Sequence, residues 1–290
     1  MRAQGARKAE GALVLAAFLF GITFVLVQDA IEDITPTGYV TVRFIIGAAV
    51  LAPFAWRIAR RDREPVGLLW QVGSVAGLLL FAGYITQTVG LQYTESSTSA
   101  FITGLYAIFT PVIEAIVRRR LPPTGVCVGV VVATGGLFLL TGAELTVGKG
   151  ELLTLACAVS FAIWIVYQGA YANRLDTIPF MTVQMAVVVA LSLPPTAGTG
   201  LGELTALAIF AAAFTGIACS SVALSLQLYG QRRVSPSRAA LLLLMEPVFA
   251  GIAGYAAGER LGAVKLAGAA VILVGIAVAE LAPEPEPAPV

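Results

Sequence analysis

The chain has 290 residues, of which 58% are apolar and 12% are charged, and its formal net charge is +1. Soluble globular domains carry about 25% charged residues, so this composition excludes an ordinary water-soluble protein. The charge balance offers no basic excess for binding nucleic acid, and a chain with 0 histidines cannot use Ser-His-Asp or Cys-His catalysis or the HExxH zinc motif.

Ten apolar runs, separated by short polar segments, follow one another along the chain. A bilayer core is about 30 Å thick, and an α-helix crosses it in roughly 20 residues. The sequence therefore predicts an all-α polytopic membrane protein with ten transmembrane helices and no soluble domain. The runs lie at about 11–29, 38–57, 66–90, 95–118, 122–141, 150–171, 177–198, 203–229, 235–257 and 262–281.

Basic residues concentrate in alternate connecting segments. If the N-terminus is cytoplasmic, 14 of the 18 basic residues lie in cytoplasmic segments, three lie in outer segments and one lies within a span. Lysine and arginine are enriched on the cytoplasmic side of a membrane. We therefore expect a multi-pass protein of the cell inner (plasma) membrane with both termini in the cytoplasm.

The chain divides into four parts. Residues 1–10 are expected to be a cytoplasmic N-terminus, because the first apolar run is longer than a signal-peptide core and no clear cleavage site follows it. Residues 11–141 and 150–281 each contain five spans. The proline-rich, acidic segment 282–290 is expected to be a disordered cytoplasmic tail.

The two five-span parts resemble each other in sequence. Because five is an odd number, the second copy must enter the membrane from the opposite side, which predicts inverted repeats around a central cavity and alternating access. The matching pairs are Phe24 with Trp164, Gln28 with Gln168, Thr41-Val42-Arg43 with Thr182-Val183-Gln184, and Pro111-Val112 with Pro247-Val248.

Four short motifs add to the repeat pattern. They are Arg43-Phe44, Thr110-Pro111-Val112, Glu246-Pro247-Val248-Phe249-Ala250 and Gly258-Glu259-Arg260-Leu261. With them, residues 11–281 resemble the EamA-type branch of the drug/metabolite transporter (DMT) superfamily. The resemblance implies a ten-span inner-membrane carrier that exports amino acids or other small metabolites through a cavity between its halves. The first half departs from the pattern, with Arg118-Arg119-Arg120-Leu121 in place of the Gly-Glu-Arg-Leu turn.

Glu246 lies near the middle of the ninth predicted span, directly before Pro247. An ionised carboxylate there is costly, so it faces a cavity, pairs with another group or takes up a proton. Pro247 and its counterpart Pro111 cannot donate backbone hydrogen bonds and are expected to kink two helices at matching positions, where inverted-repeat transporters place their sites. Two interpretations stay open: Glu246 binds a substrate amine or carries a coupling proton, or it is a protonated group that stabilises the kink.

Two further charged positions lie within predicted spans. Arg43 lies near the outer end of the second span. It is expected either to snorkel to the outer headgroups and orient the helix, or to reach the cavity mouth. Glu114 precedes Arg118 by four residues, a spacing that favours an ion pair on one helix face.

Amide and aromatic side chains in the spans are the remaining candidates for substrate binding. Amides can bond the charged ends of an amino acid, and aromatic rings can stack on an apolar substrate. Each of these residues could equally serve ordinary contact between helices. Together with Glu246, the candidates are Gln28, Tyr84, Gln87, Trp164 and Gln168.

The sequence contains no Walker motif for ATP. It therefore predicts a secondary transporter that exports small metabolites such as amino acids or derivatives by alternating access; the alternative is a lipid or lipid-sugar flippase of the same fold. No enzymatic activity, cofactor, metal or nucleic-acid partner is expected. The expected partners are a small-molecule substrate and membrane lipids. The spacing of Gly125 and Gly129 fits packing within one chain or in a homodimer, so both states stay open.

Overall fold

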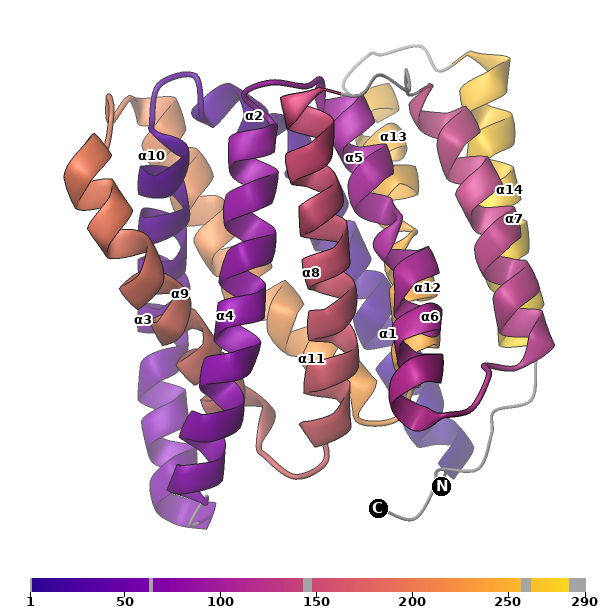
Figure 1. Cartoon of the computed structure of the whole chain (residues 1–290), viewed down its shortest axis with the longest axis horizontal. Coiled ribbons are helices and arrows are strands. Elements are labelled where there is room, and N and C mark those ends of the chain that lie inside the picture. Colours follow the sequence, from indigo (N-terminus) through magenta and orange to yellow (C-terminus); the bar gives the residue numbers. More distant parts are fainter. Residues whose placement is uncertain (1, 63–64, 143–147, 257–261, 282–290) are drawn as a thin grey trace.

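The computed structural model describes residues 2–62, 65–142, 148–256 and 262–281. The predicted tail at 282–290 and the motif at 258–261 lie outside this part. Apart from one isolated β-bridge, the regular structure of the described residues is helical (Figure 1). The helices are α1 (Arg2–Gly21), α2 (Phe24–Ala30), α3 (Pro36–Asp62), α4 (Val66–Gly90), α5 (Ser96–Gly104), α6 (Tyr106–Arg118), α7 (Thr124–Thr141), α8 (Lys149–Tyr171), α9 (Thr177–Thr199), α10 (Ala206–Phe214), the π-helix η1 (Thr215–Ala223), α11 (Leu224–Gln231), α12 (Pro236–Leu243), α13 (Glu246–Ala256) and α14 (Ala263–Glu280).

Eight helical segments in the described residues are long and apolar enough to cross a membrane. They coincide with the second to ninth predicted spans, which confirms the helical membrane fold. The first predicted span is divided between α1 and α2, and the tenth is a shorter apolar helix, Ala263–Ala279. The count of ten spans therefore stays a prediction.

Local sequence signals fix where several helices begin and end. The Thr205 hydroxyl accepts a hydrogen bond from the Ala208 backbone N–H at 3.2 Å and caps α10. Ser235 caps α12 in the same way, and Pro236 follows at the first helical position, where its missing N–H costs nothing. Helix α7 ends at Gly142, whose φ of +61° suits glycine.

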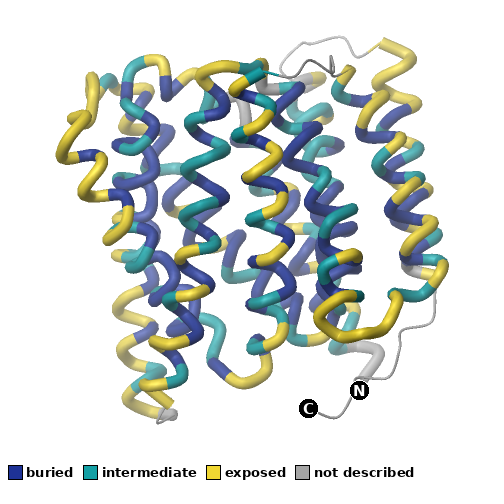
Figure 2. The backbone as a smooth tube through the Cα atoms, in the orientation of Figure 1, coloured by how far each residue is buried: buried dark blue, intermediate teal, exposed yellow. Residues whose placement is uncertain are grey.

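The outward faces of the bundle are apolar. Figure 2 shows buried residues lining the interior and exposed residues on outer faces such as those of α10 and α14. Large apolar side chains are exposed there, including Ile116 at 72% and Val131 at 70%. Exposed apolar surface on this scale is unfavourable in water and fits contact with lipid.

Contacts between loops define the two ends of the bundle. At the upper end of Figure 1, the Thr35 hydroxyl donates to the Gly200 carbonyl at 2.7 Å, and the Thr94 hydroxyl donates to Glu151 Oε1 at 2.6 Å. At the lower end, Arg232 lies 3.8 Å from Asp176. Helix α1 begins at the lower end, beside Arg233, whereas α8 begins at the upper end, so these two helices run in opposite directions.

Helices of the two predicted five-span parts, residues 11–141 and 150–281, touch each other in pairs of similar contacts. A Cβ added at Gly77 of α4 would lie 2.8 Å from the Gln184 carbonyl oxygen of α9. In mirror image, a Cβ added at Gly216 of η1 would lie 2.8 Å from the Arg43 carbonyl oxygen of α3. Arg43 and Gln184 are counterparts in the sequence repeat, so the same close backbone contact occurs twice.

Helices α7 and α14 pack backbone to backbone through four glycines. A Cβ added at Gly129 would lie 2.5 Å from the Gly275 carbonyl oxygen, and one added at Gly136 would lie 2.7 Å from that of Gly268. Gly268 lies 139 positions after Gly129, and Gly275 lies 139 positions after Gly136. If these are taken as corresponding residues of the two halves, exchanging the halves turns one glycine pair into the other. Gly129 therefore packs within the chain.

The π-helix corresponds to one extra residue in the second half. Glycines of α4 contact α9 at Gly77 and α8 at Gly90, 13 positions apart. The mirrored contacts are made by Gly216 with α3 and Gly230 with α1, 14 positions apart. The π-helical segment between Gly216 and Gly230 has more residues per turn than an α-helix, so it accommodates one more residue while both contacts keep their register.

Candidate functional site

A central cavity of about 80 Å³ lies between the two halves of the chain. It has room for a few water molecules and is well below the roughly 300–1,000 Å³ of typical ligand pockets. This conformation therefore accommodates little more than a small polar group, and a larger ligand requires the helices to move apart. The lining residues are Phe20, Thr23, Val27, Arg43, Tyr84, Gln87, Thr88, Leu91, Thr103, Tyr106, Phe161, Trp164, Ile165, Leu224, Gln227, Leu243 and Glu246.

Two interrupted helices end at the cavity. The break between α5 and α6 falls at Leu105, and Thr103 and Tyr106 on either side line the cavity. The break between α12 and α13 falls at residues 244–245, and Leu243 and Glu246 on either side line it too. The broken ends bring backbone polar groups and a helix N-terminus to the same space, as in discontinuous helices of transporters.

The two prolines lie differently relative to these breaks. Pro247 is the second residue of α13, in the first turn, where its missing N–H has no helical partner to lose. Pro111 lies inside α6, six residues after the break at Leu105. The sequence therefore located the interrupted helices, but the first interruption precedes its proline by more than a turn.

Glu246 begins α13 and its side chain borders the cavity. It is only partly buried, because the cavity leaves part of its surface open. Within the described part of the chain it has no ion-pair or hydrogen-bond partner. The carboxyl group is thus available to a ligand, and no bond of the kind expected for a purely kink-stabilising role is present.

Arg43 turns inward, so the prediction that it snorkels to the headgroups is wrong. Its side chain is 5% exposed and lines the cavity. The Arg43 Nε donates to the Ser220 hydroxyl at 2.9 Å, and Nη2 donates to the Tyr84 hydroxyl at 3.3 Å. The guanidinium carbon lies 4.6 Å from the centre of the Tyr84 ring. Hydrogen bonds and a cation–π contact inside the bundle replace the solvation that headgroups would offer.

Aromatic rings form one wall of the cavity. The ring centres of Tyr84 and Phe161 are 5.3 Å apart, and those of Phe161 and Trp164 are 6.2 Å apart. The Trp164 indole N–H donates to Gln184 Oε1 at 2.7 Å. The predicted residues Tyr84 and Trp164 therefore reach the cavity as ring faces and edges, while the polar atom of Trp164 is used by the protein.

The predicted glutamines divide into two groups. Gln87 lines the cavity and donates to the Thr103 hydroxyl at 3.2 Å. Gln168 is fully buried away from it and donates to Gln231 Oε1 at 2.6 Å, and Gln28 on α2 is not among the lining residues. Gln168 and Gln28 share one position of the repeat, so this position faces away from the cavity in both halves.

Gln227 is a lining residue that the sequence analysis missed. It lies 140 positions after Gln87, which also lines the cavity. The offset between the contact glycines is 139 for Gly77 and Gly216 before the rest of η1, and 140 for Gly90 and Gly230 after it. A repeat alignment that allows for this insertion would have paired the two glutamines. Thr88, Thr103 and Phe161 carry no comparable signal, since such residues are common in membrane helices.

The described residues contain no group of three or more Cys, Asp or Glu side chains close enough together to hold a metal ion. The functional groups that line the cavity are therefore one guanidinium, one carboxyl group, amides, hydroxyls and aromatic rings. These groups bind and orient a polar ligand.

An apolar helical bundle, interrupted helices and an internal cavity with two opposed charges define a multi-pass membrane protein of the transporter class. The EamA-like transporter family model matches residues 7–142 and again residues 148–280. The chain belongs to this family, which confirms the resemblance seen in the sequence.

Several relatives span nearly the whole chain. An uncharacterized transporter of Archaeoglobus fulgidus is 29% identical over 283 residues, covering 96% of this chain and 88% of its own. The uncharacterized inner membrane transporter YedA of Escherichia coli K12 is 25% identical and covers 93% and 90%. A protein of known crystal structure has the same fold, with a TM-score of 0.78, 21% identity and coverage of 97% and 98%.

Proposed function

We propose that the protein is an inner-membrane secondary transporter that exports small zwitterionic metabolites, amino acids or their derivatives, by alternating access. The observation that carries this proposal is that Arg43 of the first half and Glu246 of the second half face one cavity. A carboxylate of the substrate binds the guanidinium, and its ammonium group binds the carboxyl group. The aromatic wall accommodates an apolar substrate side chain.

The two charges come from different halves, and this division suits a transport cycle. A substrate that joins Arg43 on α3 to Glu246 on α13 draws the halves together around itself, and its release lets them separate toward either side. Charge-assisted hydrogen bonds are about twice as strong as neutral ones, so the ends of the substrate dominate its recognition.

We further propose that the two halves are five-span repeats of opposite orientation, ten spans in all. The mirrored contacts of Gly77 and Gly216 support this, as do the exchanged glycine pairs of α7 and α14. The opposite directions of α1 and α8 support it as well. Alternating access then amounts to exchanging the conformations of the two halves.

Counterflow in proteoliposomes tests the proposed function. Vesicles loaded with an unlabelled compound are diluted into the isotope-labelled compound, with amino acids, their amides, nucleosides and fluorescent phospholipids as the panel. We expect label to accumulate for one or more amino acids and not for phospholipids. Movement of phospholipids without amino-acid exchange would contradict the proposal in favour of a lipid or lipid-sugar flippase.

A further inference from the structure

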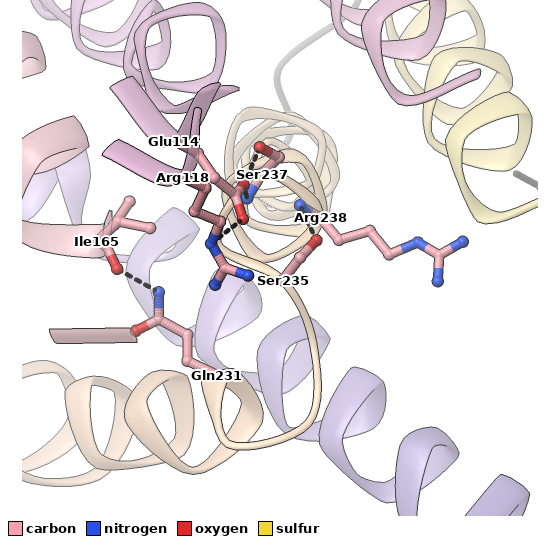
Figure 3. A network of polar contacts seen from close by, with 7 residues as sticks. All are labelled: Glu114, Arg118, Ile165, Gln231, Ser235, Ser237 and Arg238. Atoms are coloured by element: carbon pink, nitrogen blue, oxygen red, sulfur yellow. Dashed lines mark hydrogen bonds and ion pairs between the residues drawn. The ribbon is translucent and has the colours of Figure 1, made fainter. Parts of the chain in front are cut away.

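A carboxylate of the first half binds the start of a helix of the second half, below the cavity. Glu114 of α6 is 6% exposed. Its Oε2 accepts hydrogen bonds from the backbone N–H of Ser237, at 3.0 Å, and from the Ser237 hydroxyl. Its Oε1 pairs with Arg118 Nε at 3.1 Å on the same helix. Figure 3 shows Glu114 between Arg118 and the beginning of α12.

This contact is chemically well matched. Ser237 lies in the first turn of α12, where backbone N–H groups have no helical acceptor. The partial positive charge of a helix N-terminus stabilises a carboxylate placed there. The two bonds of Glu114 to Ser237 are therefore charge-assisted, and they join residues 123 positions apart.

The position of the contact makes it a barrier on one side of the cavity. Helix α6 runs from Tyr106 at the cavity down to Arg118, and α12 runs from Ser237 up to Leu243 at the cavity. These two half-helices pack against each other between the cavity and the lower end of the bundle. Glu114 joins them where they are farthest from the cavity.

The other side of the cavity lacks this arrangement. The corresponding half-helices above the cavity are α5 and α13, which make no extended contact in the residues described. The repeat counterpart of Glu114, three residues after Pro247, is Ala250, which has no polar side chain. The polar contact between α6 and α12 below the cavity thus has no counterpart between α5 and α13 in the described residues.

We propose that Glu114 is a gating residue whose bonds to the N-terminus of α12 hold the lower gate closed. These bonds thereby set the balance between the state that opens to the lower end and the state that opens to the upper end. This proposal rests on the alternating access proposed above. When the lower gate opens, Glu114 and the first turn of α12 separate and both are hydrated, so the bonds exist in one state only and favour it.

Accessibility of a single cysteine in the cavity tests the gate. The three native cysteines, Cys127, Cys157 and Cys219, are replaced by alanine, and Gln227→Cys places one thiol in the cavity lining. A membrane-impermeant methanethiosulfonate is then applied to the lower side in oriented vesicles. Because one charge-assisted contact is lost, Glu114→Ala is expected to raise the labelling rate about tenfold.

Two variants and a folding check complete the experiment. Ser237→Ala, which removes only the hydroxyl, is expected to change the rate in the same direction by less. Arg118→Gln is the matched control: Arg118 is half-exposed and its described ion pair is with Glu114 on its own helix, so labelling should stay within about twofold. Unchanged labelling in both Glu114→Ala and Ser237→Ala, with monodisperse protein on size exclusion, overturns the gate. Labelling requires no substrate. If Glu114→Ala raises the labelling rate but no amino acid is exchanged in counterflow, only the proposed function is refuted.

Discussion

Arg43 is the residue whose placement determines most about the cavity. It lies in a helix that a bilayer surrounds, and its described hydrogen-bond partners, Ser220 and Tyr84, are both neutral. A buried guanidinium is costly in an apolar surrounding, and the carboxyl group of Glu246, which borders the same cavity, is not within ion-pair distance of it in the described structure. We interpret this cost as the basis for attracting a substrate anion.

Replacing Arg43 tests which end of the substrate it binds. Arg43→Gln is expected to lower exchange of an amino acid about tenfold or more, because a hydrogen bond to a charged group contributes roughly 1.5–3 kcal/mol. The corresponding amino-acid amide, which has no carboxylate, should lose much less. The measurement is counterflow of both compounds in proteoliposomes. Equal losses for the two compounds, or none, would refute a role in carboxylate binding.

Glu246 is expected to act through its charge rather than its shape. Glu246→Gln keeps the side-chain size and should reduce amino-acid exchange at least tenfold, while the protein remains folded in the membrane. Glu203→Gln is the matched control, since Glu203 is an exposed residue of the loop between α9 and α10. If Glu246→Gln exchanges substrate like the control, with the same dependence on pH, the carboxyl group serves the helix break alone.

Charge made some site residues predictable. Arg43 and Glu246 stand out because an ionisable group within a membrane span is energetically costly and usually serves a function. The neutral residues were harder: Gln28 and Gln168 have the same chemistry as Gln87, and only the direction in which each faces separates them. That direction depends on helix rotation, which a nearly uniformly apolar helix does not reveal, because it lacks a polar stripe to mark the interior.

At the scale of the elements, close backbone approach holds the halves together. Helices α7 and α14 meet where both carry glycine, so their backbones are in contact and gain dispersion energy along their length. Gly136→Ala is expected to lower the free energy of unfolding by about 1–3 kcal/mol, because the new methyl would lie 2.6 Å from the Ile272 backbone nitrogen.

The adjacent glycine provides the control for that substitution. A Cβ at Gly135 meets nothing within 4 Å, and alanine favours helix formation over glycine. Gly135→Ala should therefore leave the thermal unfolding temperature in detergent unchanged or raise it. Equal unfolding temperatures for the two variants would show that α7 and α14 do not pack as described.

The inserted residue of η1 makes a second prediction at this scale. Deleting Ile217 returns the spacing of the two contact glycines from 14 to the 13 found in α4. We expect this variant to fold, with η1 converted to α-helix. Deleting Leu78, which also follows a contact glycine and is similarly exposed, turns the rest of α4 by about 100° and should abolish folding. Yield of monodisperse protein distinguishes them, and equal yields would contradict the insertion.

The elements were predictable to different degrees. Long apolar runs gave eight spans to within about four residues at each end, because the bilayer thickness limits their length. The breaks at Leu105 and at 244–245 were placed only approximately, since proline signals a weak point in a helix and packing decides where it yields. The π segment has no proline to indicate it, and its residues Gly216, Ser220 and Ser221 are of types common in regular membrane helices.

At the scale of the whole molecule, the proposed transport cycle depends on the two halves having opposite orientation, as proposed above. Arg43 of the first half and Glu246 of the second half both line the central cavity. The start of α1 and the start of α8 lie at opposite ends of the bundle. In a membrane, these two points must face different compartments.

Side-specific labelling of two single cysteines measures this directly. Arg7→Cys in the second turn of α1 and Lys149→Cys at the first residue of α8 are each made in a background without the exposed Cys127, in which the remaining Cys157 and Cys219 are buried. An impermeant maleimide applied to intact cells and to inverted vesicles should label position 149 only from outside and position 7 only from the cytoplasm. Labelling of both positions from the same side would contradict the inverted halves and the transport cycle built on them.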